Sequence, residues 1–341
     1  MMERVLDPLA APRQRDGSFS LTAAFVVMVV LFCVAPFVAY PVFLMKALCF
    51  SLFACAFNLL IGYVGLASFG HAMFFGWAGY LTAYAAKVGS LSIPLWFGHP
   101  MWVVIPLPQT PEVAILVGTL TAAVLGYVAG IVAIRRQGIY FAMITLALSQ
   151  MLYFFALQAK FTGGEDGIQG VPRGILFGVF DLRNETTMYL FVMLVVLAGF
   201  LLIYRIINSP FGEVLKAIRE NEQRTISLGY KTERYKLVAF VLSAALAGLA
   251  GSLKALVFQL ASLTDVHWTM SGDVLLMTLL GGLGTVFGPV MGAFVVVAMQ
   301  NYLAPFGQWV LVIQGAIFVV CVLVFRRGIV GELARLLRVQ L

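Results

Sequence analysis

Few side chains in this 341-residue chain have the types and spacing that catalysis or metal binding requires. The three histidines, His71, His99 and His267, are scattered, and none is paired with a carboxylate or a second ligand at a suitable spacing. We expect His71 to hydrogen-bond within a helix bundle, and the other two to lie in extracytoplasmic loops. The histidines therefore predict neither an enzyme nor a metal site.

The sequence also lacks a site for ATP. No Gly-Lys pair occurs in it, so the phosphate-binding P-loop is absent. If the chain is a transporter, its energy must then come from another subunit or from an ion gradient. An ion-coupled secondary transporter needs ionisable residues inside its spans. The candidates are Lys254, Asp273, His71 and, at an edge, Glu112. No carboxylate lies clearly at mid-span, which argues against ion coupling and leaves it as the alternative of a different class.

The composition indicates an integral membrane protein. Hydrophobic residues make up 62% of the chain and charged residues 11%, and the mean hydropathy is +0.98. A soluble domain carries roughly twice that charged fraction, so a cytosolic enzyme, a disordered chain and a nucleic-acid-binding module are excluded. The net charge of +7 needs no nucleic-acid partner, because basic residues of membrane proteins collect in cytoplasmic loops. Four cysteines lie in apolar runs, and we expect them to be buried as small hydrophobic residues: Cys33, Cys49, Cys55 and Cys321.

Nine apolar segments have about the length that spans a bilayer. They follow a polar N-terminal tail at 1–20, make up a transmembrane domain at 21–325 and precede a C-terminal tail at 326–341. The predicted segments are 21–40, 42–61, 66–86, 113–134, 139–159, 188–206, 237–260, 274–299 and 309–325.

Basic residues orient these segments. If the two tails and the loops at 135–136 and 205–236 are cytoplasmic, that side holds 16 of the 22 Lys and Arg residues. The opposite-side loops then keep Lys46, Lys87, Lys160, Arg173 and Arg183. If each of the nine segments crossed the membrane once, however, Arg326 and Arg327 would lie on the side opposite to the N-terminal tail, away from the other cytoplasmic basic residues. We therefore expect eight to ten helices, one of the apolar segments being two.

The segment at 274–299 is the one that we expect to be divided. Residues 281–289 read GGLGTVFGP, and four glycines and a proline make a poor continuous helix. Non-helical backbone at membrane depth must be covered by protein or line a cavity. The pattern predicts two short segments joined by a break or re-entrant turn; one kinked helix is the alternative.

The most informative polar stretch lies within the predicted cytoplasmic region 207–235. Ser209 is a natural N-cap, and Pro210 suits the first helical position. Phe211, Leu215 and Ile218 recur at helical spacing, which predicts a short helix with one apolar face. A second helical piece at 223–228 should end at a left-handed Gly229. This amphipathic element could lie on the lipid surface or dock into a groove of a soluble partner.

Three groups of residues carry a family resemblance. They are 58–76 (NLLIGYVGLASFGHAMFFG), 138–147 with 162–168 (GIYFAMITLA and TGGEDGI), and 209–251, with SPFG, AIRENE, KLVAFVLSA and AGLAG in order. These stretches resemble the inner-membrane permease subunits of ABC importers for branched-chain amino acids, and within that family the M-type subunit. The resemblance covers about residues 45–325.

The resemblance implies a type II ABC importer permease fold, all-α and polytopic, in a bacterial inner membrane with both termini cytoplasmic. It implies a second permease subunit, two cytoplasmic ATPase subunits that bind the ATP, an extracytoplasmic substrate-binding protein, and no cofactor in this chain. The coupling contacts to the ATPase would then come from Ser209, Pro210, Phe211, Gly212, Leu215, Ile218, Arg219, Glu222 and Gly229. The Glu-Ala-Ala triplet of the importer coupling motif is missing, since residues 223–225 are Gln, Arg and Thr.

Polar residues within the spans are candidates for the translocation path or for hydrogen bonds between helices. They are Asn58, Ser68, His71, Thr145, Ser149 and Gln150. Small residues at four-residue spacing predict close helix packing at Gly248, Gly251, Gly284, Gly288 and Gly292. The extracytoplasmic loop 160–187 is either the docking site of the binding protein or a solvated connector. No residue in the sequence indicates whether the substrate is a branched-chain amino acid or the urea or short-chain amide that related permeases carry.

Overall fold

A computed structural model describes residues 17–37, 39–97, 99–106, 110–136, 138–307, 309–324 and 328–337. Most of the predicted N-terminal tail, and Arg326 and Arg327 of the C-terminal tail, lie outside these described residues.

The described chain is almost entirely helical, which confirms the all-α polytopic class. Five helices are long and apolar enough to cross a membrane: α2, which continues into a π-helical turn η2 (Pro41–Val64 together), α4 (Pro111–Ala133), α5 (Ile139–Gln158), α6 (Glu185–Ile207) and α9 (Thr232–Phe258). Shorter apolar helices join them: α1 (Gly17–Val34), α3 (Ala72–Val88), α10 (Trp268–Gly281), α11 (Gly288–Leu303) and α12 (Trp309–Val324).

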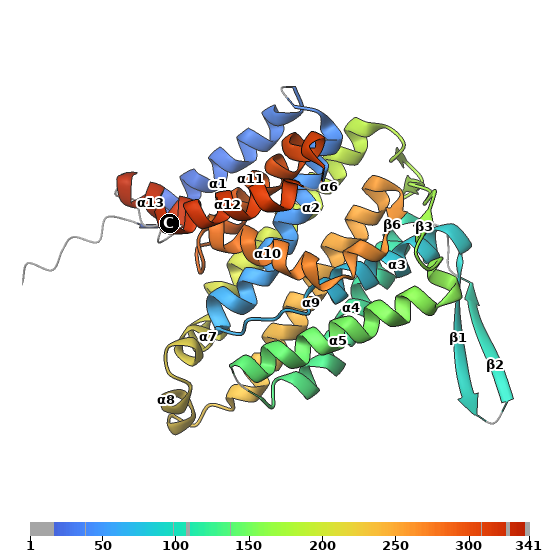
Figure 1. The fold of residues 1–341 in the computed structure, drawn as a ribbon, viewed down its shortest axis with the longest axis horizontal. Coiled ribbons are helices and arrows are strands. Elements are labelled where there is room, and N and C mark those ends of the chain that lie inside the picture. Colours follow the sequence, from blue (N-terminus) through green and yellow to red (C-terminus); the bar gives the residue numbers. More distant parts are fainter. Residues whose placement is uncertain are drawn as a thin grey trace, which may run out of the picture.

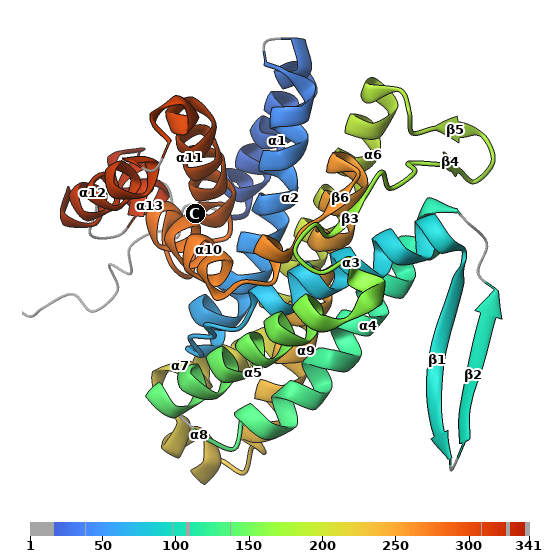
Figure 2. The same ribbon diagram turned by 45° about the vertical axis from the view of Figure 1, so that its right-hand side comes forward.

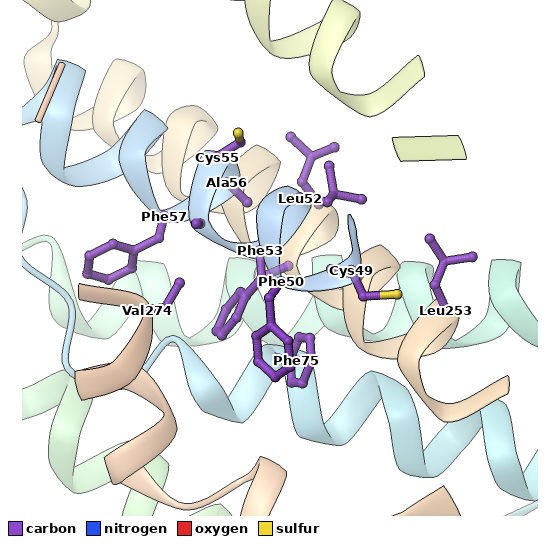
Figure 3. Packing of buried hydrophobic residues seen from close by; sticks show 14 of the residues in the cluster. Cys49, Phe50, Leu52, Phe53, Cys55, Ala56, Phe57, Phe75, Leu253 and Val274 are labelled. Carbon is purple, nitrogen blue, oxygen red and sulfur yellow. The ribbon is translucent and has the colours of Figure 1, made fainter. Parts of the chain in front are cut away.

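The central element of the bundle is α2 (Pro41–Asn58). Of the 18-residue apolar stretch that could span the membrane within Pro41–Val64, 94% is buried inside the protein. α10, α11 and α12 lie on one side of it, and α3, α4 and α5 lie on the other, as both views show (Figures 1 and 2). Figure 3 shows Phe50 and Phe53 of α2 beside Phe75 of α3, and the ring centroids of Phe53 and Phe75 are 4.5 Å apart. Because lipid tails are as apolar as these side chains, close packing holds the helices together here.

The predicted span at 66–86 is wrong at its start. α2 ends in the π-helical turn η2 (Leu59–Val64), and Gly65 closes that turn in the left-handed region at φ 82°. Residues 65–71 are not helical, and α3 begins only at Ala72. Gly70 packs so closely on α5 that a Cβ there would lie 2.1 Å from the Thr145 carbonyl oxygen. Leu66, Ala67 and Phe69 keep this segment largely apolar despite Ser68 and His71, so hydropathy does not reveal that the helix is interrupted.

The predicted division of 274–299 is confirmed. α10 ends at Gly281, α11 begins at Gly288, and Pro289 occupies the first turn of α11. Gly282 and Gly284 have φ values of 123° and 75°, which favour glycine. Within the described residues, two predicted spans are thus interrupted, at 65–71 and at 282–287, and these segments are called the first and second break.

The remaining elements connect the helices. The hairpin of β1 (Ser90–Phe97) and β2 (His99–Pro106) projects from the bundle (Figure 1), and β4 (Ile175–Leu176) pairs with β5 (Phe180–Asp181). β3 (Ile168–Gln169) pairs with β6 (Leu260–Ala261). Short 3-10 turns are η1 (Ala35–Phe37), η3 (Lys160–Thr162), η4 (Leu263–Asp265) and η5 (Ala304–Phe306). α13 (Gly328–Leu337) lies in the predicted C-terminal tail but packs on α10 and α11, where a Cβ at Gly328 would meet the Gly282 Cα at 2.4 Å.

Candidate functional site

The predicted cytoplasmic region contains two short helices, α7 (Pro210–Glu220) and α8 (Glu222–Ser227). As predicted, Ser209 is the N-cap of α7: its Oγ accepts a hydrogen bond from the Gly212 N–H at 3.3 Å and donates to the Ile206 carbonyl at 2.6 Å. A Cβ at Gly212 would lie 2.2 Å from the Ile207 carbonyl oxygen. Glycine at this position therefore lets α7 pack directly against the end of α6.

The apolar face of α7 packs into its own chain. Leu215 is 0% and Ile218 4% exposed, and the Phe211 ring stacks on Tyr235 of α9 at a centroid distance of 5.6 Å. This face lies neither on lipid nor in a partner's groove, the two destinations that the sequence left open. An amphipathic pattern shows that a face will be covered, but any apolar surface can cover it. Leu215 and Ile218 therefore position α7 and are not available for contact with another subunit.

α8 is anchored at its start. The Asn221 Oδ1 accepts a hydrogen bond from the Arg224 N–H at 3.0 Å and so caps the helix. The Glu222 Oε1 lies 2.5 Å from the Nζ of Lys236, which is 4% exposed, and it accepts a further hydrogen bond from Thr232 at 3.2 Å. The predicted residue Glu222 is thus half-buried against α9. Because breaking a buried ion pair is strongly destabilising, α8 and α9 should move together.

The end of α8 is exposed and apolar. Ile226, Leu228 and Tyr230 are 46%, 69% and 43% exposed, and they surround Gly229, whose φ is 90°. A Cβ at Gly229 would have no atom within 4 Å. These four residues are called the α8 tip, and α8 lies at one end of the molecule (Figure 2). Of this set only Gly229 was predicted from the sequence, although apolar residues alternate with Ser227 and Gly229 within a polar loop, which is a signal of this surface.

Arg219 connects α7 to both helix breaks. Its Nη1 donates a hydrogen bond to the Gly62 carbonyl in η2. A Cβ at Gly65 would lie 3.2 Å from the Arg219 Cγ, and a Cβ at Gly284 would lie 3.1 Å from its Nη1. One side chain of the predicted coupling region thus lies against the first break at Gly65 and the second at Gly284.

Asn58, at the end of α2, bonds to the second break. Its Nδ2 donates to the Thr285 carbonyl at 2.9 Å, and its Oδ1 accepts from the Gly284 N–H at 3.1 Å. A Cβ at Gly62 would lie 2.9 Å from the Gly284 nitrogen, so η2 and the second break are in close contact. Asn58, Gly62, Arg219, Gly284 and Thr285 are called the break clamp. The clamp gives hydrogen-bond partners to the Gly62 and Thr285 carbonyls and to the Gly284 N–H.

Two of the other predicted path residues bond to distant parts of the chain. The His71 Nε2 lies 2.8 Å from the Ser243 Oγ, and the Ser149 Oγ donates to the Val266 carbonyl at 3.4 Å. Thr145 donates to the Ala142 carbonyl of its own helix at 2.9 Å, and the buried Ser68 Oγ has no hydrogen-bond partner among the described residues. The buried members of the set are Asn58, Ser68, His71, Thr145 and Ser149, whereas Gln150 is half-buried. A role in the translocation path stays a prediction.

Four of the five predicted packing glycines lie at close helix contacts. A Cβ at Gly248 would lie 2.3 Å from the Ala122 Cβ, and one at Gly251 1.9 Å from the Phe75 carbonyl oxygen. Gly288 lies against the end of α10, and a Cβ at Gly292 would lie 1.8 Å from the Met277 carbonyl oxygen. Gly284 is different: it belongs to the break and contacts Arg219, so it does not continue the stripe of Gly288 and Gly292.

Comparison with known proteins agrees with this architecture. The family model described as branched-chain amino acid transport system / permease component matches residues 40–322. The high-affinity branched-chain amino acid transport system permease protein LivM of Escherichia coli K12 is 27% identical over 285 residues, which cover 77% of this chain and 63% of LivM.

Two further relatives match over a smaller share of this chain. A probable LivM of Methanocaldococcus jannaschii is 28% identical over 54% of this chain and 55% of its own length. The xylose transport system permease protein XylH of Escherichia coli K12 is 30% identical over 44% of this chain and 39% of its own length. No solved structure matches. On the match to residues 40–322, the chain belongs to the branched-chain amino acid transport permease family.

Proposed function

We propose that this chain is the membrane-spanning permease subunit of an ATP-driven importer for branched-chain amino acids. The observation that carries the proposal is the α8 tip, which exposes apolar side chains at one end of the molecule and is joined through α7 to both helix breaks. Exposed apolar clusters of this kind are typical of protein contacts. The substrate is supported by the names of the LivM relatives.

The α8 tip is the surface that contacts an ATPase subunit. When the two ATPases close on ATP, they displace α8 and the α7 that is packed beside it. Because α7 is fixed by buried Leu215 and Ile218, it moves as a unit, and Arg219 transmits that movement to the breaks. The breaks are the parts of α2 and α10–α11 that change conformation as the path alternates its access.

The complete importer holds a second permease subunit, two ATPases that bind and hydrolyse the ATP, and an extracytoplasmic binding protein that docks on residues 160–187. It lies in a bacterial inner membrane with both termini in the cytoplasm. Figure 2 shows the end of α4, the start of α5 and the pair α7–α8 at one end of the molecule. Arg135 and Arg136 follow α4 in the chain, and these basic residues support a cytoplasmic location for that end. A urea or short-chain amide importer of the same family is the alternative substrate class.

Purification from native membranes in mild detergent, with mass spectrometry of the co-purifying proteins, tests the assembly. We expect a second permease and ATPase subunits in the complex, and ATP-dependent uptake of leucine after reconstitution with the binding protein. A chain that purifies alone and transports without regard to ATP would overturn the proposal and favour the ion-coupled class. Uptake of urea without leucine would move the substrate to the alternative class.

A further inference from the structure

A cavity of about 250 Å³ lies beside β3, between the end of α3 and residues 160–168, and is called the β3 cavity. Figures 1 and 2 both draw β3 at the opposite end of the molecule from α8. Two other cavities among the described residues measure about 10 Å³ each, which is room for no more than a single water molecule. The β3 cavity therefore admits a group of many atoms.

Two lysines give the β3 cavity its charge. Lys87 and Lys160 both line it and are exposed, and the Lys87 Nζ donates to the Gln169 carbonyl at 2.9 Å, which holds that ammonium group beside β3. None of the three ion pairs within 4 Å among the described residues includes either lysine, although Glu165 and Asp166 belong to the same loop. A cleft lined by charges of one sign attracts the opposite sign, so the β3 cavity favours an anion.

The loop that closes the cavity is fixed by its own hydrogen bonds. Thr162 is fully buried, and its Oγ1 lies 2.6 Å from both the Ala156 and the Ala159 carbonyl oxygens. Gly167 has a φ of 68°, and a Cβ there would lie 2.2 Å from the Ala261 carbonyl oxygen of β6. The cavity is thus formed before a ligand arrives, and binding costs little ordering of the chain.

Aromatic rings continue from the cavity to the exposed face of α5. The Phe161 ring centroid lies 5.8 Å from that of Tyr84 and 6.0 Å from that of Trp77, and Trp77 lies 5.7 Å from Phe155 of α5. Phe161 and Phe155 are 36% and 52% exposed, and only 22% of the apolar stretch of α5 that could span the membrane is buried. Aromatic side chains near the ends of spans lie at the level of the lipid headgroups. A ligand here meets two cations at one end and apolar rings at the other.

We propose that the β3 cavity binds an anionic phospholipid, with its phosphate at Lys87 and Lys160 and an acyl chain along Phe161 and Phe155. Phosphate oxygens accept charge-assisted hydrogen bonds from both ammonium groups. The rings and the apolar stems of the lysines offer surface to the acyl chain. A carboxylate of the binding protein, for which residues 160–187 are the proposed docking region, would occupy the lysines but leave the rings uncovered. The inference goes beyond the proposed function and does not depend on it.

The test uses the protein as it purifies from native membranes, reconstituted in nanodiscs, with phospholipids brominated on their acyl chains as probes. Bromine quenches tryptophan fluorescence on contact, and Trp77 lies within the row of rings, so its quenching reports an acyl chain at the site. Trp77→Phe identifies the contribution of this tryptophan. The measured quantity is the preference for brominated phosphatidylglycerol over brominated phosphatidylcholine.

The variants separate charge from structure. Lys87→Gln/Lys160→Gln removes both cations, and Lys87→Arg/Lys160→Arg keeps them. Lys216→Gln/Lys231→Gln is the matched control, because it removes the same charge from α7 and from the start of α9. Thermal unfolding in phosphatidylcholine nanodiscs reports whether each variant is folded, and the wild-type measurement decides by itself if one is not.

Each lysine near an anionic headgroup favours it by about fivefold, so we expect a preference for phosphatidylglycerol of about fivefold or more at Trp77 in the wild type. The arginine variant and the control should keep this preference, and the glutamine variant should lose it. Equal quenching by the two lipids in the wild type would overturn the site, as would a preference that survives the loss of both lysines. If the wild type shows no preference and the glutamine variant binds the binding protein about tenfold more weakly, the cavity belongs to that protein and the lipid site is refuted.

Discussion

Replacing Arg219 by alanine should disconnect the ATPase from the helix breaks without dismantling the importer. Arg219 lies on the exposed side of α7, whereas the residues that fix α7 to the bundle are the buried Leu215 and Ile218. The alanine variant should therefore fold and bind its partners. What it loses is the guanidinium contact to Gly62 and the neighbouring contact to Gly284.

The size of the effect follows from that contact. A hydrogen bond from a charged donor is worth about 1.5–3 kcal/mol. If this free energy couples α7 to the breaks, its loss weakens the coupling by roughly 10- to 150-fold. Stimulation of ATP hydrolysis by the loaded binding protein, which must pass through the same connection, should then fall about tenfold or more. Arg219→Lys should be intermediate, because an ammonium donates as a point charge and lacks the planar fork.

The assay measures basal and stimulated ATP hydrolysis of the reconstituted importer. Lys216→Ala is the control: it removes a cation from the same helix, where Lys216 forms a surface ion pair with Glu213 at 2.8 Å. Such pairs contribute about 0–1 kcal/mol, so stimulation should stay near wild type. The reasoning is refuted if Arg219→Ala retains full stimulation and uptake, or if ATPase subunits no longer co-purify with it.

Three further substitutions test the rest of the site. Leu228→Arg should release the ATPase subunits during purification and leave thermal unfolding unchanged, because Leu228 is 69% exposed; ATPases that stay bound would contradict the α8 tip as their contact. Leu215→Asp should destabilise the chain by about 3 kcal/mol or more, since it buries a carboxylate, and an unchanged melting temperature in detergent would show that α7 is not packed as described. Asn58→Ala should leave two backbone groups of 282–287 unpaired, at about 1–3 kcal/mol each, and so speed amide exchange there; unchanged exchange would exclude the clamp.

Much of the fold could be predicted because its signals are local. Long apolar runs predict the spans, Ser209 predicts the start of a helix, and the glycines at 281–288 predict a break. Each of these signals depends only on residues that are close together in the sequence. The interruption at 65–71 was missed, because Leu66, Ala67 and Phe69 keep the segment apolar enough to resemble a span, and Gly65 and Gly70 are its marks of a break.

The site was harder to predict, because its contacts join distant parts of the chain. Arg219 and Gly62 are 157 residues apart, and nothing local indicates that they meet. Lys46 was assigned to an opposite-side loop although the predicted segment at 42–61 contains it. The structure places it in the second turn of α2, which begins at Pro41.

The hairpin of α10 and α11 carries the second break, which is held by Asn58 and Arg219. The two helices pack too closely to slide, since a Cβ at Gly292 would lie 1.8 Å from the Met277 carbonyl oxygen. Gln300 of α11 also donates a hydrogen bond to the Asp273 carboxylate of α10 at 3.2 Å. A displacement of the break therefore moves both helices of the hairpin together. On this view, loss of Arg219 lowers stimulated hydrolysis because α7 no longer moves the hairpin as one unit.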